Sequence, residues 1–460
     1  MKRALAVAAA LVAGCTTVGP DYERPRVPMP AEYAAAAGAG TAPIPAWWTL
    51  YRDPLLDSLV ESTRSNNMDL RLAAARVRQA EAVLAETDAT RYPEVIGGYT
   101  ATRNRVSSRI SPPNVPPLER TQHGVVAGTS YEIDFWGRVA RASESARASL
   151  AASRLSREVV ALTLSSATTQ AYFALRSLDA QIAALDASVR TRADSLEIAQ
   201  ARLQAGLAPE LDVHQARAAL SDVRVQLLEA RRQRALVEHQ LGQLTGRMDL
   251  RVAPGDLFAL PLPPTPPPGL PSALLDRRPD VQAAEQVLVA ANAQIGVARA
   301  ALFPTISLTG ALGAQSAELS SLLSTGAGIW TLGASLTLPI FDAGRRSARV
   351  DEAAAVREQA LAQYVGSIES AFRETSDALV NLDLAARAEA DIGQRLDAAR
   401  AALELSSERY KSGYSPYLEV LDAQRTANDA ELAFVRYRQL RLAFSVDLIK
   451  ALGGGWTPAD

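Results

Sequence analysis

The chain has 460 residues, and its 48 basic and 50 acidic side chains leave a net charge of -2 at pH 7. That near-neutral charge argues against a nucleic-acid binder held by phosphate contacts. The single cysteine excludes an intrachain disulfide and a cysteine-rich metal cluster. Length alone predicts roughly three domains, an expectation that repetition within the chain revises.

The first residues have the pattern of a bacterial lipoprotein signal. A basic start precedes an apolar run over residues 4–13, which is shorter than the about 20 residues of a membrane-spanning helix and typical of a cleaved secretion signal. The tetrad Val12-Ala13-Gly14-Cys15 resembles a lipobox, so residues 1–14 are predicted to be removed and the Cys15 thiol to form a thioether with diacylglycerol. An ordinary signal peptide beside a coincidental cysteine is the alternative. Thr16 stands where an aspartate would resemble an inner-membrane retention signal, so outer-membrane delivery is expected.

An extended tether is predicted to follow the lipid. Residues 15–46 are rich in proline, alanine and glycine. Such a composition favours extended backbone and buries no core. We therefore interpret this segment as a lipidated link between the membrane and the folded body.

The remaining chain consists of two similar halves. The octapeptide at 202–209 recurs at 409–416 with its arginine, glycine and proline in the same places, 207 residues later. Such internal similarity indicates one structural unit present twice. The predicted boundaries are a first repeat at 47–253, a proline-rich linker at 254–271, a second repeat at 272–456 and a tail at 457–460.

Each repeat is predicted to contain one very long helix. Residues 138–205 hold no glycine or proline, which predicts a helix of roughly 100 Å at about 1.5 Å per residue. Its counterpart at 345–412 is interrupted only by two glycines, and apolar residues at spacings of three, four and seven are typical of a coiled coil. Tight turns should lead into shorter antiparallel helices at 210–241 and 417–452. Further helices are expected at about 55–90 and 280–302.

Four strands are predicted between the helices, at about 95–105, 122–134, 305–314 and 328–340. The last alternates large apolar residues with small polar ones, and about 9–11 such residues can cross a membrane as a tilted β-strand. A soluble sheet edge is the alternative for any one strand; repetition and membrane destination favour a barrel. Four strands cannot close, and open edges are not tolerated in lipid, so several chains must contribute. Two chains give eight strands with a filled interior, whereas three give twelve and leave room for a conduit.

These patterns resemble the TolC-like outer membrane factor family, in particular its lipoprotein branch serving multidrug efflux pumps of the resistance-nodulation-division type. The match runs from the lipobox to about Gly455. The residues that carry it are Cys15, Gly19-Pro20-Asp21-Tyr22, Pro25, Trp47-Trp48, Asp53-Pro54, residues 131–138, Leu274-Leu275, residues 277–280, Ala284-Glu285, Ile295-Gly296, Phe303-Pro304, residues 338–342, Gly344-Arg345, Arg409-Tyr410 and Asp422-Ala423-Gln424.

The resemblance implies a mainly α-helical homotrimer with a 12-stranded outer-membrane β-barrel, four strands per chain, continued by a long periplasmic α-helical barrel. It also implies a passive, gated conduit that carries drugs or other small toxic compounds out of the cell. The expected partners are a periplasmic adaptor (membrane fusion protein), an inner-membrane transporter and outer-membrane lipid, without nucleic acid. The alternatives are a periplasmic structural or adaptor lipoprotein and an outer-membrane channel for protein secretion.

The hairpin turns are the predicted functional sites. Gly206, Pro209, Gly413 and Pro416 fix tight turns, and these exposed ends are the expected docking surface for adaptor hairpins. Beyond the second turn, Glu419 and Asp422 lie three residues apart on one helix side. In a threefold assembly, such carboxylates would form rings that resist joint ionisation or recruit cations.

The resemblance assigns a periplasmic gate to this region. Leu418 and Asp422 match apolar and acidic constricting rings, with Glu419 close by, although charges at helical spacing usually face water. Tyr410 and Asp212 match positions whose hydrogen bond helps to hold neighbouring hairpins closed. Ser415 stands where some family members carry an arginine link, so that link is expected to be absent.

No enzyme is predicted. The three histidines are scattered without a His-Glu-x-x-His arrangement, no phosphate-binding loop is present, and lipid consumes the one thiol. We expect no cofactor or metal beyond the covalent lipid on Cys15. Asp280, beside a basic pair, is interpreted as a helix N-cap.

Overall fold

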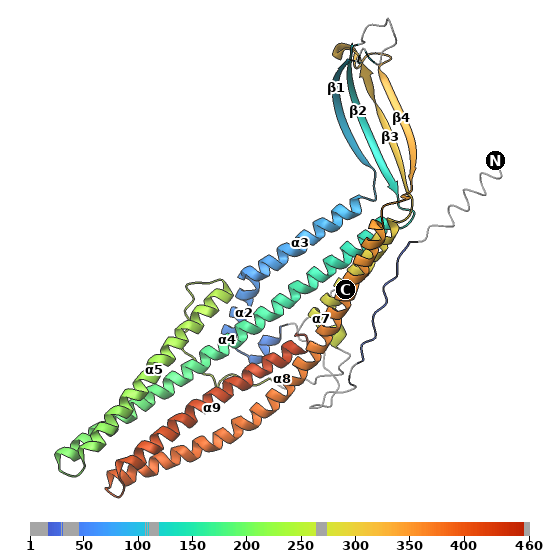
Figure 1. Ribbon diagram of the computed structural model, residues 1–460. Helices are drawn as coiled ribbons and strands as arrows, with labels where there is room; N and C mark the ends of the chain where they lie inside the picture. Colours follow the sequence, from blue (N-terminus) through green and yellow to red (C-terminus); the bar gives the residue numbers. More distant parts are fainter. Residues whose placement is uncertain are drawn as a thin grey trace. The chain divides into compact units, whose positions relative to one another are not determined.

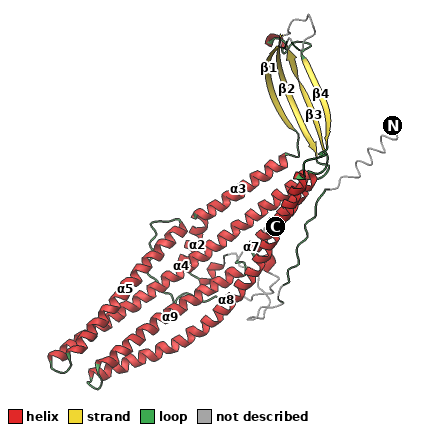
Figure 2. Ribbon diagram, viewed as in Figure 1, coloured by secondary structure: helices red, strands yellow, loops and turns green. Residues whose placement is uncertain are grey.

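The computed structural model describes residues 17–28, 30, 46–105, 107, 109, 119–263 and 274–454. The predicted signal peptide and Cys15 lie outside these residues, as do most of the predicted tether and residues 264–271 of the linker. The described chain is mainly helical with one four-stranded sheet (Figure 2). No described helix contains a stretch apolar enough to span a bilayer.

The same order of elements occurs twice (Figure 1). The first half contains the short 3-10 helix η1 (Trp47–Tyr51), then α2 (Pro54–Asn66), α3 (Met68–Ala89), β1 (Glu94–Arg105), β2 (Glu119–Ile133), α4 (Arg138–Gln204) and α5 (Glu210–Thr245). The second contains α6 (Leu274–Arg277), α7 (Pro279–Ala300), β3 (Thr305–Ser316), η3 (Leu319–Ser321), β4 (Gly328–Thr337), α8 (Arg345–Lys411) and α9 (Tyr417–Ala451). The two long helices, the two return helices and the four strands confirm the predicted elements.

Two local predictions were wrong. The single helix expected at about 55–90 is two helices, because Asn67 adopts an extended conformation between them. Its side chain accepts a hydrogen bond from the Asp69 backbone N–H at 2.8 Å and donates to the Leu244 carbonyl at 2.9 Å. Asp280 lies inside the first turn of α7 and is not its N-cap; both its oxygens accept hydrogen bonds from Arg278 instead.

The chain divides into two compact units. The first comprises residues 1–26, 76–153 and 283–364, and the second comprises residues 27–75, 154–282 and 365–460. The sheet belongs to the first unit, and both hairpin turns belong to the second.

The sheet of the first unit has two chemically different faces. Its strands pair antiparallel in the order β1-β2-β3-β4, and directly opposed residues point to the same side. One row across the strands is Val95, Thr129, Gly310 and Leu332, and the next is Gly97, Ala127, Leu312 and Trp330. This side, the apolar face, carries Trp330, Leu332 and Leu336 of β4, whereas Ile329, Thr331, Gly333 and Ser335 point to the other side. β1 and β4 are both edge strands.

Residues 17–24, here called the strap, are held against the helices of the first unit. The Val18 N–H donates to the Trp136 carbonyl at 3.1 Å. Asp21 pairs with buried Arg141 at 2.6 Å, and Arg24 pairs with buried Glu285 at 2.7 Å. At Gly19 a side chain would fall 2.5 Å from the Gly296 Cα, so this close approach requires glycine. The composition of the segment predicted extended backbone without indicating these contacts.

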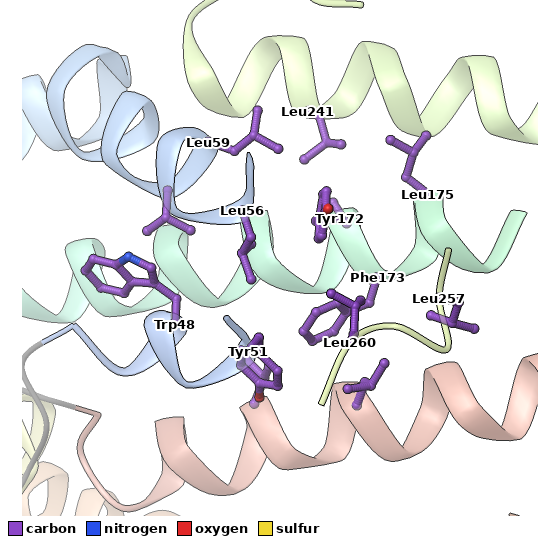
Figure 3. Packing of buried hydrophobic residues seen from close by; sticks show 14 of the residues in the cluster. Trp48, Tyr51, Leu56, Leu59, Tyr172, Phe173, Leu175, Leu241, Leu257 and Leu260 are labelled. Atoms are coloured by element: carbon purple, nitrogen blue, oxygen red, sulfur yellow. The ribbon is translucent and has the colours of Figure 1, made fainter. Parts of the chain in front are cut away.

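The second unit has an apolar core built from η1, α2, α4, α5 and α9 (Figure 3). Tyr51 of η1, Leu56 of α2, Phe173 of α4 and Leu241 of α5 are fully buried in it. The Tyr51 ring meets Phe173 edge-on at 4.8 Å, and its hydroxyl shares a hydrogen bond with Ser445 of α9 at 2.7 Å. The core therefore joins helices from both repeats.

Next to this core, a buried ionic cluster fixes the start of the linker. Asp179 of α4 is almost fully buried and contacts Arg176 at 3.1 Å and Arg234 of α5 at 2.6 Å. It also accepts a hydrogen bond from the Gly255 N–H at 3.0 Å. The two arginines donate to the carbonyls of Ala253 and Val252, respectively. One carboxylate thus ties α4, α5 and the linker together.

Within the second unit, the long helices form a row in the order α5-α4-α9-α8 (Figure 1). Inside each hairpin the contacts are apolar, with Leu185, Leu220 and Val223 between α4 and α5 and with Leu396, Ala399 and Ala430 between α8 and α9. Between the hairpins, the middle of the α4–α9 contact is polar. Ser188 bonds Asn428 at 3.0 Å, and Gln424 bonds Ser195 at 2.8 Å. We call these four residues the polar seam.

We predict that Asp179→Asn lowers the free energy of unfolding by about 3–5 kcal/mol, because it removes the carboxylate partner of buried Arg176 and leaves half-buried Arg234 with only Glu238 at 3.4 Å. Asp186→Asn is the matched control: it lies on the same helix and pairs with Arg231 at 3.1 Å, but near the surface, and should cost less than about 1 kcal/mol. Denaturant unfolding followed by helical circular dichroism measures both. Equal losses would contradict the structural role given to Asp179.

Candidate functional site at the hairpin tips

Both hairpins turn through the same backbone motif. After α4, the Gly206 and Leu207 N–H groups bond back to the carbonyls of Leu203 and Arg202. After α8, Gly413 and Tyr414 do the same to Tyr410 and Arg409. Both glycines have positive φ, 73° and 82°, as this helix-ending motif requires. Pro209 and Pro416 then stand at the N-cap positions of α5 and α9, so these four predicted residues do shape the turns.

The tips of the two hairpins share a small core. Tyr410 and Tyr417 are buried there with Ala199, Val213 and Ala216 from the first repeat, and their rings lie 5.4 Å apart. Neither tyrosine hydroxyl has a hydrogen-bond partner among the described residues. Burial, followed by the neighbouring Tyr410, raises the pKa of Tyr417 to about 12. Both rings are therefore neutral packing groups with unused polar atoms.

Arg202 links the tips directly. Its guanidinium lies over the Tyr410 ring, 4.8 Å from the centroid, and donates to the Tyr410 carbonyl at 2.6 Å. Its equivalent in the second repeat, Arg409, instead faces Glu419 at 3.8 Å on the surface. Sequence reasoning missed Arg202 and Tyr417. The repeated arginine at 202 and 409 was a visible signal, but only the folded chain shows which copy crosses between repeats.

The structure brings Asp212 and Tyr410 into electrostatic range without the expected hydrogen bond. Burial raises the pKa of the Tyr410 hydroxyl, and the Asp212 carboxylate raises it further. Burial also raises the pKa of Asp212, with Arg202 opposing the shift. Because the Tyr410 hydroxyl is unpartnered among the described residues, the closing bond implied by the resemblance is not formed within this chain.

Leu418, Glu419 and Asp422 lie on the exposed side of α9, opposite the buried Tyr417 and Val420. Leu418 is 60% exposed, and Glu419 and Asp422 are exposed as well, with Glu419 near Arg409 at 3.8 Å. Within one chain, this side of α9 is therefore open to another copy or a pore. Ser415, at the position of the missing arginine link, is buried at the turn. Arg202 provides a different link between the hairpins.

The turns also carry exposed apolar side chains at equivalent positions of the repeats. Leu207 and Leu211 in the first hairpin match Tyr414 and Leu418 in the second, and all four are more than half exposed. The described residues contain no group of three acidic, histidine or cysteine side chains placed to hold a metal ion. The tips therefore offer apolar contact and carboxylates, which suit docking and constriction.

A sheet with one apolar face, joined in sequence to long helical hairpins with a narrow polar and apolar tip, is typical of a channel subunit that serves the outer membrane. The outer membrane efflux protein family model matches residues 59–247 and 270–454. The chain belongs to this family, which makes it an outer-membrane channel component of an efflux system.

Individual relatives agree along nearly the whole length. The solvent efflux pump outer membrane protein SrpC of Pseudomonas putida is 32% identical, and the probable outer membrane lipoprotein SilC of Salmonella typhimurium is 31% identical; each match covers 97% of both chains. The open-state crystal structure of the Neisseria gonorrhoeae MtrE outer membrane channel is 29% identical, covers 96% of this chain and 98% of its own, and superposes with a TM-score of 0.87.

We predict that acidification stabilises the packed tip. The raised pKa of Asp212 means that the packed tip favours the protonated carboxyl, so this stabilisation grows as pH falls through the raised pKa and is lost as pH rises. Conductance of the reconstituted channel should therefore fall as the pH is lowered through this raised pKa, and Asp212→Asn should flatten that dependence. Exposed Asp194→Asn is the control and should leave the profile intact. An unchanged profile in Asp212→Asn would refute the prediction.

Proposed function

We propose that three copies of this chain form a passive exit duct for small toxic compounds. The observation that carries the proposal is that both rows of elements end in unsatisfied edges. In the first unit, β1 and β4 lack a second neighbour, and open strand edges are not tolerated in lipid. In the second unit, the row of helices ends in α5 and α8.

The outer faces of these end helices carry exposed apolar residues, with charged pairs such as Glu229 and Arg232 between them. Val225, Leu228 and Leu236 on α5 are each more than half exposed, and their spacing places them on one side of the helix. Val380, Leu384 and Leu405 form a similar exposed line on α8. An α5 face against the α8 face of the next copy is a head-to-tail contact, which builds a closed ring when the rotation permits. Three copies give the twelve strands that leave a conduit open.

The tips are proposed to serve as both gate and docking surface. In a threefold ring, Leu418 would supply an apolar constriction, and Glu419 and Asp422 would supply acidic ones. The polar seam supports movement of one hairpin against the other, since its side-chain hydrogen bonds can be exchanged for bonds to water, while the small tyrosine core at the tips must separate as well. Exposed Leu207, Leu211 and Tyr414 suit contact with the coiled-coil hairpins of a periplasmic adaptor, which would connect the duct to an inner-membrane transporter.

The remaining features of the proposal concern anchoring and cargo. Cys15 would carry a covalent lipid, as the name of the relative SilC supports for that protein. The name of SrpC points to solvents, so small apolar compounds are the proposed cargo, selected largely by the transporter. A passive duct requires no catalytic residue. An adaptor lipoprotein or a protein-secretion channel gains no support from these features, since the family is one of efflux proteins.

We predict that Leu228→Glu disrupts the ring, because it introduces charge into the apolar α5 face. The purified protein should then migrate as a monomer, whereas the parent should give a heat-modifiable trimer on gels. Met248→Glu is the matched control, because Met248 is 83% exposed but lies outside the α5 line. A trimer that survives Leu228→Glu as well as the control would contradict this mode of closure.

We also predict that Asp422→Ala combined with Tyr410→Phe gives a leaky channel. The first change removes a carboxylate from the acidic constriction, and the second removes the Tyr410 hydroxyl, the group that the family resemblance pairs with Asp212. Single-channel conductance of the reconstituted protein should rise above that of the parent. Conductance equal to that of the parent would defeat the assignment of the gate.

A further inference from the structure

A groove crosses the apolar face of the sheet. Its volume is about 440 Å³, within the range of small-ligand sites. Ala127, Thr129 and Gly310 form its floor, while Val95 stands on one side and Leu312, Trp330 and Leu332 on the other. Small residues between tall apolar ones thus form a trough that accepts an apolar chain.

The strap lies beside the end of β2 and the start of β3, here called the foot of the sheet. Val18 bonds the Trp136 carbonyl, three residues beyond the end of β2. Trp136 in turn donates its indole N–H to the Pro304 carbonyl at 2.8 Å, directly before β3. A side chain on Gly137 would collide with Thr17, so Thr17 also lies at this foot. The strap is fixed there by the ion pairs of Asp21 and Arg24.

The groove lies close enough to the strap for a lipid attached to Cys15 to enter it. Thr129 lies four residues up the strand from Ile133, which is about 13 Å at 3.3 Å per residue. Cys15 is two residues before Thr17, a span of at most about 7 Å. An acyl chain reaches about half of the roughly 30 Å hydrocarbon core. A lipid on Cys15 therefore reaches the groove in the half of the sheet nearest the helices.

We infer that this groove is the seat of one acyl chain of the lipid carried by Cys15. The inference rests on the proposed lipidation. Tethering favours this occupant over a free membrane lipid, because the strap gives the attached chain a high effective concentration at the sheet. The seated chain covers the trough with apolar surface and holds the N-terminus against the same protomer's sheet.

The test uses the full lipidated protein in its native membrane. A photoreactive benzoylphenylalanine replaces Leu332 at the groove wall; the matched control replaces Ile329 on the same strand, which points to the other face of the sheet. After illumination and trypsin digestion, the Leu332 probe should be joined to the lipid of the peptide that spans residues 15–26, and the Ile329 probe should not. Ala127→Trp, which fills the floor, should abolish this product while leaving the lipid and the trimer in place.

The other outcomes separate the two proposals. If Cys15 carries its lipid but the Leu332 probe is joined only to phospholipid or lipopolysaccharide chains, the groove does not hold the acyl chain of Cys15. The proposed lipid anchor then stands. If the mass of the intact protein shows no lipid on Cys15, both the proposed lipid anchor and the acyl-chain site are wrong. Trimer formation and conductance still test the proposed duct separately.

Discussion

One physical constraint governs this structure: a strand edge cannot remain unpaired inside a membrane. Each chain supplies four paired strands whose two edges, β1 and β4, stay open. The helical row of the second unit has the same incompleteness, since α5 and α8 expose apolar lines to solvent. Both features need other copies of the chain, so assembly is part of the fold and not an addition to it.

The two repeats make different contacts at their equivalent hairpin turns. Equivalent turns are built by the same backbone hydrogen bonds, yet Arg202 crosses to Tyr410 while its counterpart Arg409 stays on the surface. Apolar contacts hold each hairpin together, whereas the contact between the hairpins combines the polar seam with the small apolar core at the tips. This contrast favours opening of the proposed gate between the hairpins and not within them.

Local sequence pattern predicted most of the elements, because long runs without glycine or proline and strict alternation are strong local signals. The end of α4 and the start of β3 agree with expectation to within one residue. The break at Asn67 escaped prediction, since its side chain caps α3 only where Leu244 is near. Arg202 and Asp179 were not predicted because Tyr410, the partner of Arg202, and Arg234 and Gly255, two partners of Asp179, lie elsewhere in the chain. Only packing decides which charged residue becomes buried.

The central claim is that the α5 face of one copy meets the α8 face of the next. Leu236 and Leu384 are both about half exposed and lie at similar distances from their turns, and the one native cysteine is expected to be blocked by lipid. Cysteines at both positions should form disulfides between copies under oxidation, provided their Cα atoms come within about 7 Å. The account predicts a covalent series on non-reducing gels that stops at the trimer. A monomer only, or a series that continues past the trimer, would contradict it.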